Sequence, residues 1–290
     1  MHSPWVQAAR PATLWAALAP VLVAGGLASG DGVFRWDAFI AAALGAIAIQ
    51  IATNFANDAS DAKRGADTED RIGPTRMVAT GVITERQMWT ATALTFGVAA
   101  LAGIWLITIA GWIIAIIGVA SILAGLGYVG GPRPYGYRGL GELFVFVFFG
   151  VVATVGSRFV HDQTFPLDAW LLAIPMGFLV TAILVANNIR DLETDRSVGK
   201  RTLAVILGRP KTEQLYAGLI YGAFIAITVF GTLRLTPLAT LIAVFWLPWG
   251  VGLVRTIYNE TSGAALIGAL KATARLQLLV AFSLALGASA

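Results

Sequence analysis

The chain has 290 residues, of which 57% are hydrophobic and only 12% are charged, and its mean hydropathy is +0.76. This composition is too apolar for an ordinary soluble domain and predicts an all-α, polytopic membrane protein. The formal net charge of +4 does not indicate a nucleic-acid partner, because the basic residues cluster in the loops between apolar runs. The sequence contains no cysteine, which excludes disulfides and thiolate chemistry, and its two histidines make a His-based metal site unexpected.

Nine apolar runs predict a bundle of nine transmembrane helices. No linker or soluble domain separates them, so residues 1–290 are expected to form a single integral-membrane domain. In chain order the predicted spans are Leu14–Ser29, Trp36–Ala56, Met88–Ile107, Trp112–Val129, Leu140–Val160, Trp170–Ala186, Leu215–Leu233, Leu238–Val254 and Leu276–Ala290.

The distribution of basic residues predicts how the bundle is oriented. With nine spans, 17 of the 20 Lys and Arg residues fall on the side of the N-terminus, and only Arg35, Arg158 and Arg234 fall opposite. Because basic loops stay in the cytoplasm, the N-terminus and the polar loops on its side are expected to be cytoplasmic and the C-terminus external. The expected location is the cell membrane.

The second predicted span ends in a cluster of amide and carboxylate side chains. These are Asn54, Asn57, Asp58 and Asp61. The loop that follows mixes both signs of charge and contains Lys63, Arg64, Asp67, Arg71 and Arg76. Its Gly73-Pro74 pair favours a turn that folds the arginines back over a phosphate group.

A similar cluster follows the sixth predicted span. If that helix continues, Asn187, Asp191 and Asp195 recur every four residues and share one face. Asn188 lies beside Asn187, and Arg196, Lys200 and Arg201 follow just beyond Asp195.

Two acidic clusters at the ends of membrane helices favour a site for Mg²⁺ and a diphosphate group. Mg²⁺ prefers a few carboxylates together with phosphate oxygens, and Arg and Lys neutralise the remaining charge. A pair of metal sites would grip one pyrophosphate from two sides. The repeat is imperfect, because Ala62 occupies the position equivalent to Asp195. The sequence therefore leaves open whether Asp61 or Asp67 completes the first site.

The segment Gly127–Gly139 combines turn residues with three tyrosines and two arginines. Aromatic faces stabilise a nearby cation, and arginines bind a carboxylate or a diphosphate. Glu142 lies just inside the next apolar run, where an acid is expected to face the bundle interior or a water-filled cavity.

These motifs together resemble the UbiA superfamily of intramembrane prenyltransferases, and within it the 1,4-dihydroxy-2-naphthoate polyprenyltransferases of menaquinone biosynthesis. The residues that carry the resemblance are Asn57–Asp61 with Asp70–Arg76, Gly130–Glu142, and Asn187–Asp195 with Gly199–Thr202. The resemblance covers essentially the whole chain and implies the UbiA-type fold. It also implies Mg²⁺-dependent transfer of a polyprenyl group from its diphosphate to 1,4-dihydroxy-2-naphthoate, with loss of the carboxylate and formation of demethylmenaquinone.

The resemblance implies a role for each candidate residue. The metal ligands, with two or more Mg²⁺ ions bridging the diphosphate, are expected among Asp58, Asp61, Asp67, Asp191 and Asp195. Tyr128 and Tyr135 are expected to flank an allylic cation. Binding of diphosphate and acceptor is expected from Asn54, Asn57, Lys63, Arg71, Arg76, Arg138, Asn187, Asn188, Lys200 and Arg201. The polyprenyl tail is expected to lie between helices that are open to membrane lipid.

Other functions remain open from the sequence. The acceptor of a UbiA-type enzyme can instead be 4-hydroxybenzoate, homogentisate or a tetrapyrrole. A cation-coupled transporter would also use paired Asn and Asp residues, but it would place them near the bilayer midplane. A phosphotransferase for alcohol-phosphatidate exchange would gather its acids in one cluster.

Overall fold

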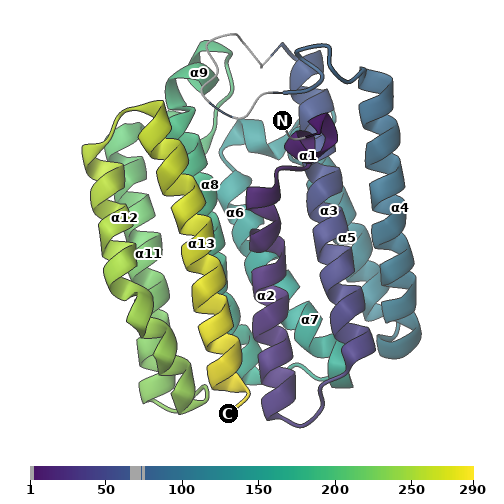
Figure 1. Ribbon diagram of the computed structural model, residues 1–290, viewed down its shortest axis with the longest axis vertical. Helices are drawn as coiled ribbons and strands as arrows, with labels where there is room; N and C mark the ends of the chain where they lie inside the picture. The colour runs from purple at the N-terminus through teal and green to yellow at the C-terminus, as the bar shows by residue number, and fades with distance from the viewer. Residues whose placement is uncertain (1–2, 66–72, 74–75) are drawn as a thin grey trace.

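The computed structural model describes residues 3–65, 73 and 76–290, and all its regular elements within those residues are helical (Figure 1). The long elements are α2 (Pro11–Gly30), α3 (Trp36–Lys63), α4 (Glu85–Ala110), α5 (Ile113–Gly127), α8 (Leu167–Arg190), α11 (Arg209–Thr232), α12 (Leu247–Asn259) and α13 (Gly263–Ala288). Between α5 and α8 one span is built from α6 (Gly141–Val145), a π-helical stretch η2 (Phe146–Val152) and α7 (Ala153–Asp162). The short elements are α1 (Pro4–Ala9), the 3₁₀ turns η1 (Tyr135–Arg138) and η3 (Leu238–Trp246), α9 (Leu192–Ser197) and α10 (Leu203–Leu207).

The predicted all-α membrane bundle is confirmed. Among the described residues, eight helical segments are long and apolar enough to cross a membrane, and each of the nine predicted spans overlaps a helix. The remaining predicted span, the fourth in chain order, corresponds to α5, which has only 15 residues, or about 22 Å at 1.5 Å per residue, and is short of a full hydrocarbon layer. The count of nine crossing helices is therefore approximate.

Local sequence signals explain where several helices begin. Pro11 occupies the first position of α2, where its missing N–H costs nothing. Thr84 caps α4 in a capping box with Gln87, and the Ser262 side chain accepts a hydrogen bond from Ala265 N at the start of α13. Thr84 and Ser262 thus fix the residues at which α4 and α13 begin.

Small residues allow the helices to approach closely at the centre of the bundle. Helix α13 packs against α2, α8 and η3 and so joins the N-terminal and C-terminal parts of the chain. A Cβ atom at Gly26 would lie 2.4 Å from the Ala285 Cα atom, and one at Gly150 would lie 2.4 Å from the Gly177 Cα atom. Glycine at these two positions lets backbones touch, which is how membrane helices associate without a hydrophobic driving force between them.

The polar loops gather at one end of the bundle. In Figure 1 the N-terminus, α1 and α9 lie at the upper end, and the C-terminus lies at the lower end. Helix α3 has 28 residues, about 42 Å, so its last turns extend beyond the apolar layer at the upper end. The first acidic cluster is on those turns, and the second lies at the junction of α8 and α9.

Candidate active site

The first acidic cluster lies inside helix α3 and is buried. Asn54, Asn57, Asp58 and Asp61 are each less than 9% exposed. The helix continues through them without a break, which keeps them on successive turns. Three of these side chains form hydrogen bonds or ion pairs with neighbouring segments, each in a different way.

Asn54 fastens the start of α2 to α3. Its amide nitrogen donates to the Ala9 carbonyl at 2.9 Å and to the Thr13 hydroxyl at 3.0 Å, and its oxygen accepts from Gln50 at 3.3 Å. The same junction holds Arg10 in a left-handed conformation, with φ at 52°. Asn54 thus places the α1 to α2 junction, including Arg10, at the rim of the site.

Asp58 anchors the loop that follows α3. One carboxylate oxygen accepts from Met77 N at 3.1 Å, and the other accepts from Val78 N at 3.0 Å. Each is a charge-assisted hydrogen bond to a backbone N–H. This contact fixes the residue just before Met77, which is Arg76.

Asp61 is bound from two directions. Arg76 forms an ion pair with its Oδ2 atom at 2.5 Å, and both side chains are almost fully buried. The hydroxyl of Tyr137, from turn η1, donates to Oδ1 at 2.9 Å. The first cluster is thereby connected both to its own loop and to the loop between α5 and α6.

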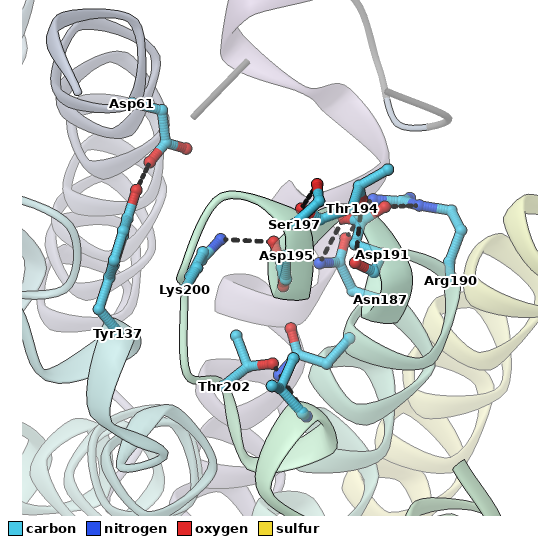
Figure 2. Close-up of polar contacts among 12 residues, drawn as sticks. Asp61, Tyr137, Asn187, Arg190, Asp191, Thr194, Asp195, Ser197, Lys200 and Thr202 are labelled. Carbon is cyan, nitrogen blue, oxygen red and sulfur yellow. Dashed lines mark hydrogen bonds and ion pairs between the residues drawn. The ribbon is translucent and has the colours of Figure 1, made fainter. Parts of the chain in front are cut away.

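The second cluster forms where α8 ends. The expected continuous helical face is interrupted at Asp191, which has φ −93° and ψ 6° and separates α8 from α9. Its carboxylate accepts from Arg190 Nε at 2.7 Å and from the same guanidinium's Nη2 at 2.5 Å. Asn187 accepts from Arg190 at 2.9 Å. Figure 2 shows these three side chains in one hydrogen-bonded group.

Asp195 remains near Asp191 despite the interruption. Its backbone N–H donates to the Asp191 carbonyl at 2.7 Å, which preserves one helical turn between them. Lys200 Nζ lies 3.4 Å from the Asp195 carboxylate, and both side chains are mostly buried (Figure 2). Each of Asp61, Asp191 and Asp195 thus has a basic partner.

The two clusters face a common cavity of about 820 Å³. Its polar mouth is lined by Arg10, Asn54, Asn57, Asp61, Arg76, Asn187, Arg190, Asp191, Lys200 and Lys271. Below the mouth the walls become apolar, and the cavity reaches Ala42, Leu106, Ile114 and Val160. Ala42 precedes Asp61 by 19 positions on α3, which is about 28 Å along the helix. The cavity is therefore a deep apolar channel with a charged entrance.

Aromatic side chains form the wall just below the entrance. Tyr128 meets Tyr135 edge to face at 5.5 Å, Tyr135 stacks on Phe144 at 3.9 Å, and Phe148 follows at 6.0 Å from Phe144. Burial, and then the nearby Glu142 carboxylate, raises the pKa of Tyr128, and burial also raises the pKa of Tyr135. Both phenols are neutral near pH 7, so they present ring faces and hydroxyl donors.

The structure divides the candidate residues into groups. Those lining the cavity are Asn54, Asn57, Asp61, Arg76, Tyr128, Tyr135, Asn187, Asp191 and Lys200. Asp58 and Asp195 are buried beside it. Asn188 is also buried, and its amide donates to Glu142 at 2.8 Å. Exposed positions outside the lining are Lys63, Arg138 and Arg201. Asp67 and Arg71 lie outside the described residues.

Some site residues were missed by sequence reasoning. Arg190 directly precedes Asp191, and this adjacency to an acidic motif was the available signal. Arg10, between α1 and α2, and Lys271, in α13, are distant from both acidic motifs in the sequence, and only the fold brings them to the entrance. Tyr137 contacts Asp61, whereas its neighbour Arg138 is exposed and does not line the cavity.

The donor set suits Mg²⁺ bound together with a diphosphate. Within the described part of the chain, no group of three or more His, Asp or Glu side chains is close enough to hold an ion by itself. Mg²⁺ sites that include substrate phosphates use only one or two protein carboxylates for each ion. Asp61 on one side of the entrance and the Asp191 and Asp195 pair on the other meet that requirement.

Comparisons with known proteins agree with this geometry. The family model described as the UbiA prenyltransferase family matches residues 17–285. A 1,4-dihydroxy-2-naphthoate octaprenyltransferase of Mycobacterium tuberculosis is 42% identical over 80% of this chain and 79% of its own length. The protein of the same name from Escherichia coli is 35% identical over 98% of this chain and 94% of its own length.

Solved structures show the same fold at low sequence identity. A UbiA homolog from Archaeoglobus fulgidus, bound to DMAPP and Mg²⁺, aligns with a TM-score of 0.70 at 13% identity. The alignment covers 97% of this chain and 99% of that one. A digeranylgeranylglyceryl phosphate synthase aligns with a TM-score of 0.64 at 15% identity, over 98% and 97% of the two chains.

Proposed function

Because the chain belongs to the UbiA prenyltransferase family, we propose that it transfers a polyprenyl group from its diphosphate to 1,4-dihydroxy-2-naphthoate in the membrane. In this reaction the carbon–oxygen bond to the diphosphate breaks and a carbon–carbon bond to the naphthoate ring forms. Pyrophosphate and carbon dioxide leave, and the prenylated product is the hydroquinone demethylmenaquinol, because the acceptor is itself a hydroquinone and no oxidant takes part. Later two-electron oxidation of this product gives demethylmenaquinone, a menaquinone precursor. The main support for the proposal is that the two acidic clusters lie at the mouth of one cavity, and that this cavity is deep and apolar enough to hold a polyprenyl chain.

Asp61, Asp191 and Asp195 would hold two or more Mg²⁺ ions between them, with Asp58 kept as a further candidate. The bound metal would stabilise negative charge on the departing pyrophosphate. The chain itself supplies Arg76, Arg190 and Lys200, whose cationic groups lie at the same entrance. Such fixed charges stabilise a leaving group more in a water-poor site than in water.

The apolar channel and its aromatic wall account for the rest of the reaction. The polyprenyl tail would extend along the channel and the reacting carbon would lie beside Tyr128 and Tyr135. Their neutral rings stabilise positive charge that develops on the allylic carbon. Burial of this region keeps water from capturing the cation before the naphthoate ring does.

The proposed orientation places the entrance in the cytoplasm. The positive-inside rule supports this, because 17 of the 20 Lys and Arg residues fall on the N-terminal side of the predicted spans. The N-terminus and α9 lie at the same end of the bundle (Figure 1). Diphosphate donors would then reach the site from the cytoplasmic side, and the tail would enter from membrane lipid.

An acceptor panel tests the proposal. Purified protein would receive a long allylic diphosphate, Mg²⁺ and equal amounts of 1,4-dihydroxy-2-naphthoate, 4-hydroxybenzoate and homogentisate. We expect mass spectrometry to find the prenylated, decarboxylated naphthalene as the main product. A prenylated benzoate or homogentisate product would keep the reaction class and replace the acceptor.

A further inference from the structure

Tyr137 lies between the two acidic clusters. Its hydroxyl donates to Asp61 Oδ1 at 2.9 Å, and the two side chains face each other in Figure 2. Lys200 Nζ lies 5.3 Å from the centre of its ring, and the same Nζ atom pairs with Asp195. A single aromatic side chain therefore contacts a carboxylate of the first cluster and the basic partner of the second.

A second cation strengthens this connection. The Arg64 guanidinium lies 5.5 Å from the centre of the Tyr137 ring and also donates to the Gly131 carbonyl. Cations at these distances are attracted to the ring by its quadrupole. Arg64 thus ties the end of α3 to the loop that carries Tyr137.

The loop holds Tyr137 in a defined place. Gly136 N donates to the Tyr128 carbonyl at 2.9 Å, and a Cβ atom at Gly136 would lie only 2.6 Å from that carbonyl oxygen. Gly139 ends turn η1 with φ at 72°. Glycine is required at both positions, at the first by the close approach and at the second by the left-handed backbone. The turn between them presents Tyr137 to Asp61.

We propose that Tyr137 is a positioning residue that couples the two acidic clusters, so that they bind one Mg²⁺-diphosphate group together. Its hydroxyl orients Asp61, and its ring holds Lys200 on the opposite side of the entrance. This inference rests on the proposed function, because it assigns Tyr137 a part in binding the diphosphate that the reaction consumes. Tyr137 does not line the cavity and acts through Asp61 and Lys200.

The two oxygens of the Asp61 carboxylate have different partners. The hydroxyl of Tyr137 donates to Oδ1 at 2.9 Å. Arg76 occupies the other oxygen of that carboxylate, so both oxygens have fixed directions.

Two substitutions distinguish the contribution of the Tyr137 hydroxyl from that of its ring. Tyr137→Phe removes the hydrogen bond to Asp61 and keeps the ring that attracts Arg64 and Lys200. Tyr137→Leu removes both. The matched controls are Tyr258→Phe and Tyr258→Leu, because Tyr258 is 45% exposed near the end of α12, away from the cavity lining.

The test measures binding and turnover separately on the full chain in detergent. Calorimetry would follow the binding of inorganic pyrophosphate with Mg²⁺, and steady-state assays would give kcat and the KM for the prenyl diphosphate. For Tyr137→Phe we expect pyrophosphate affinity to fall and KM to rise by about 10-fold, with kcat changed by less than about 3-fold. For Tyr137→Leu we expect pyrophosphate affinity to fall on the order of 100-fold, since the contacts of the ring with Arg64 and Lys200 are also removed. The Tyr258 variants should match the wild type.

Different outcomes would overturn different claims. If Tyr137→Phe binds pyrophosphate as tightly as the wild type, or more tightly, the positioning role is wrong. If kcat falls while binding is unchanged, Tyr137 acts on the chemistry instead. Absence of any prenylated product from the wild type would overturn the proposed function, whereas the pyrophosphate titration would still decide the role of Tyr137.

Discussion

Arg76 and Asp61 form a buried ion pair at the entrance of the cavity, at 2.5 Å between side chains that are 5% and 1% exposed. The two residues are 15 positions apart and belong to different segments, helix α3 and the loop after it. Asp58 holds that loop in place through Met77 and Val78. The acidic residue that we assign to metal binding is therefore already charge-compensated by the arginine that we assign to the diphosphate.

Replacing Arg76 by Ala should impair both stability and substrate binding. The change leaves the Asp61 carboxylate buried without its cation, and breaking a buried pair in this way costs about 3 to 5 kcal/mol. We expect a lower melting temperature and a KM for the prenyl diphosphate that rises at least ~10-fold, because a charge-assisted contact is lost. Arg86→Ala is the matched control, since Arg86 is exposed at the start of α4. Equal behaviour of the two variants would contradict the assignment of Arg76.

Replacing Asp191 by Asn should abolish turnover and leave the protein folded. The amide nearly preserves the shape of the side chain but removes the charge that would hold Mg²⁺. We expect kcat/KM to fall more than ~100-fold, in line with the loss of a group that stabilises the leaving charge. Glu193→Gln is the control, because the Glu193 side chain lies two residues away and is 77% exposed. Its kcat/KM should remain within about twofold of the wild type, since exposed ion pairs contribute little. An active Asp191→Asn enzyme would show that this residue does not bind the metal.

Replacing Asp58 by Asn should loosen the loop after α3. Asn offers one acceptor oxygen to the two N–H groups of Met77 and Val78, so one of them loses its partner, at a cost of about 1 to 3 kcal/mol. We expect faster amide hydrogen exchange at Met77 and Val78, together with a higher KM for the diphosphate. Asp37→Asn, at the opposite end of α3, serves as the control. Unchanged exchange at both amides would mean that Asp58 does not anchor the loop.

Filling the apolar channel should shorten the donors that the enzyme accepts. A Cβ atom at Gly118 would meet no atom within 4 Å, and Gly118 lines the cavity ten positions before Tyr128, about 15 Å along α5. Gly118→Leu should therefore lower kcat/KM for long polyprenyl diphosphates while short allylic diphosphates remain substrates.

Gly97→Leu provides the control for this channel variant. Gly97 has equally open surroundings, but it lies on an exposed face of α4 and does not line the cavity. It should leave the preference for donor length unchanged. If Gly118→Leu lowered kcat/KM equally for short and long donors, the polyprenyl tail would not lie along this channel.

The fold and the two acidic motifs were predictable from the sequence because both depend on local patterns. Apolar runs of sufficient length identify membrane helices, and Asn and Asp residues at the ends of such runs mark a polar site. The individual roles depend on distant contacts. Asn54 was expected to orient a ligand, yet its amide also fastens Ala9 and Thr13.

Local spacing describes only part of the second cluster. Four-residue spacing places Asn187, Asp191 and Asp195 on one face if the helix continues; α8 ends before Asp191, but backbone hydrogen bonds still join Asp191 N to the Asn187 carbonyl and Asp195 N to the Asp191 carbonyl. The spacing did not show that the Arg190 guanidinium binds the Asp191 carboxylate beside it. Likewise, only the folded loop shows that Tyr137 meets Asp61.

The most direct test of the account follows both products of the reaction at once. Purified protein would be given a long allylic diphosphate and 1,4-dihydroxy-2-naphthoate, with Mg²⁺ in one sample and with a chelator in the other. We expect pyrophosphate and demethylmenaquinol, counted together with the demethylmenaquinone that forms when it is oxidised, in equal amounts with Mg²⁺ and neither with the chelator. Formation of either form in the presence of the chelator, or the absence of both forms from both samples, would contradict the account.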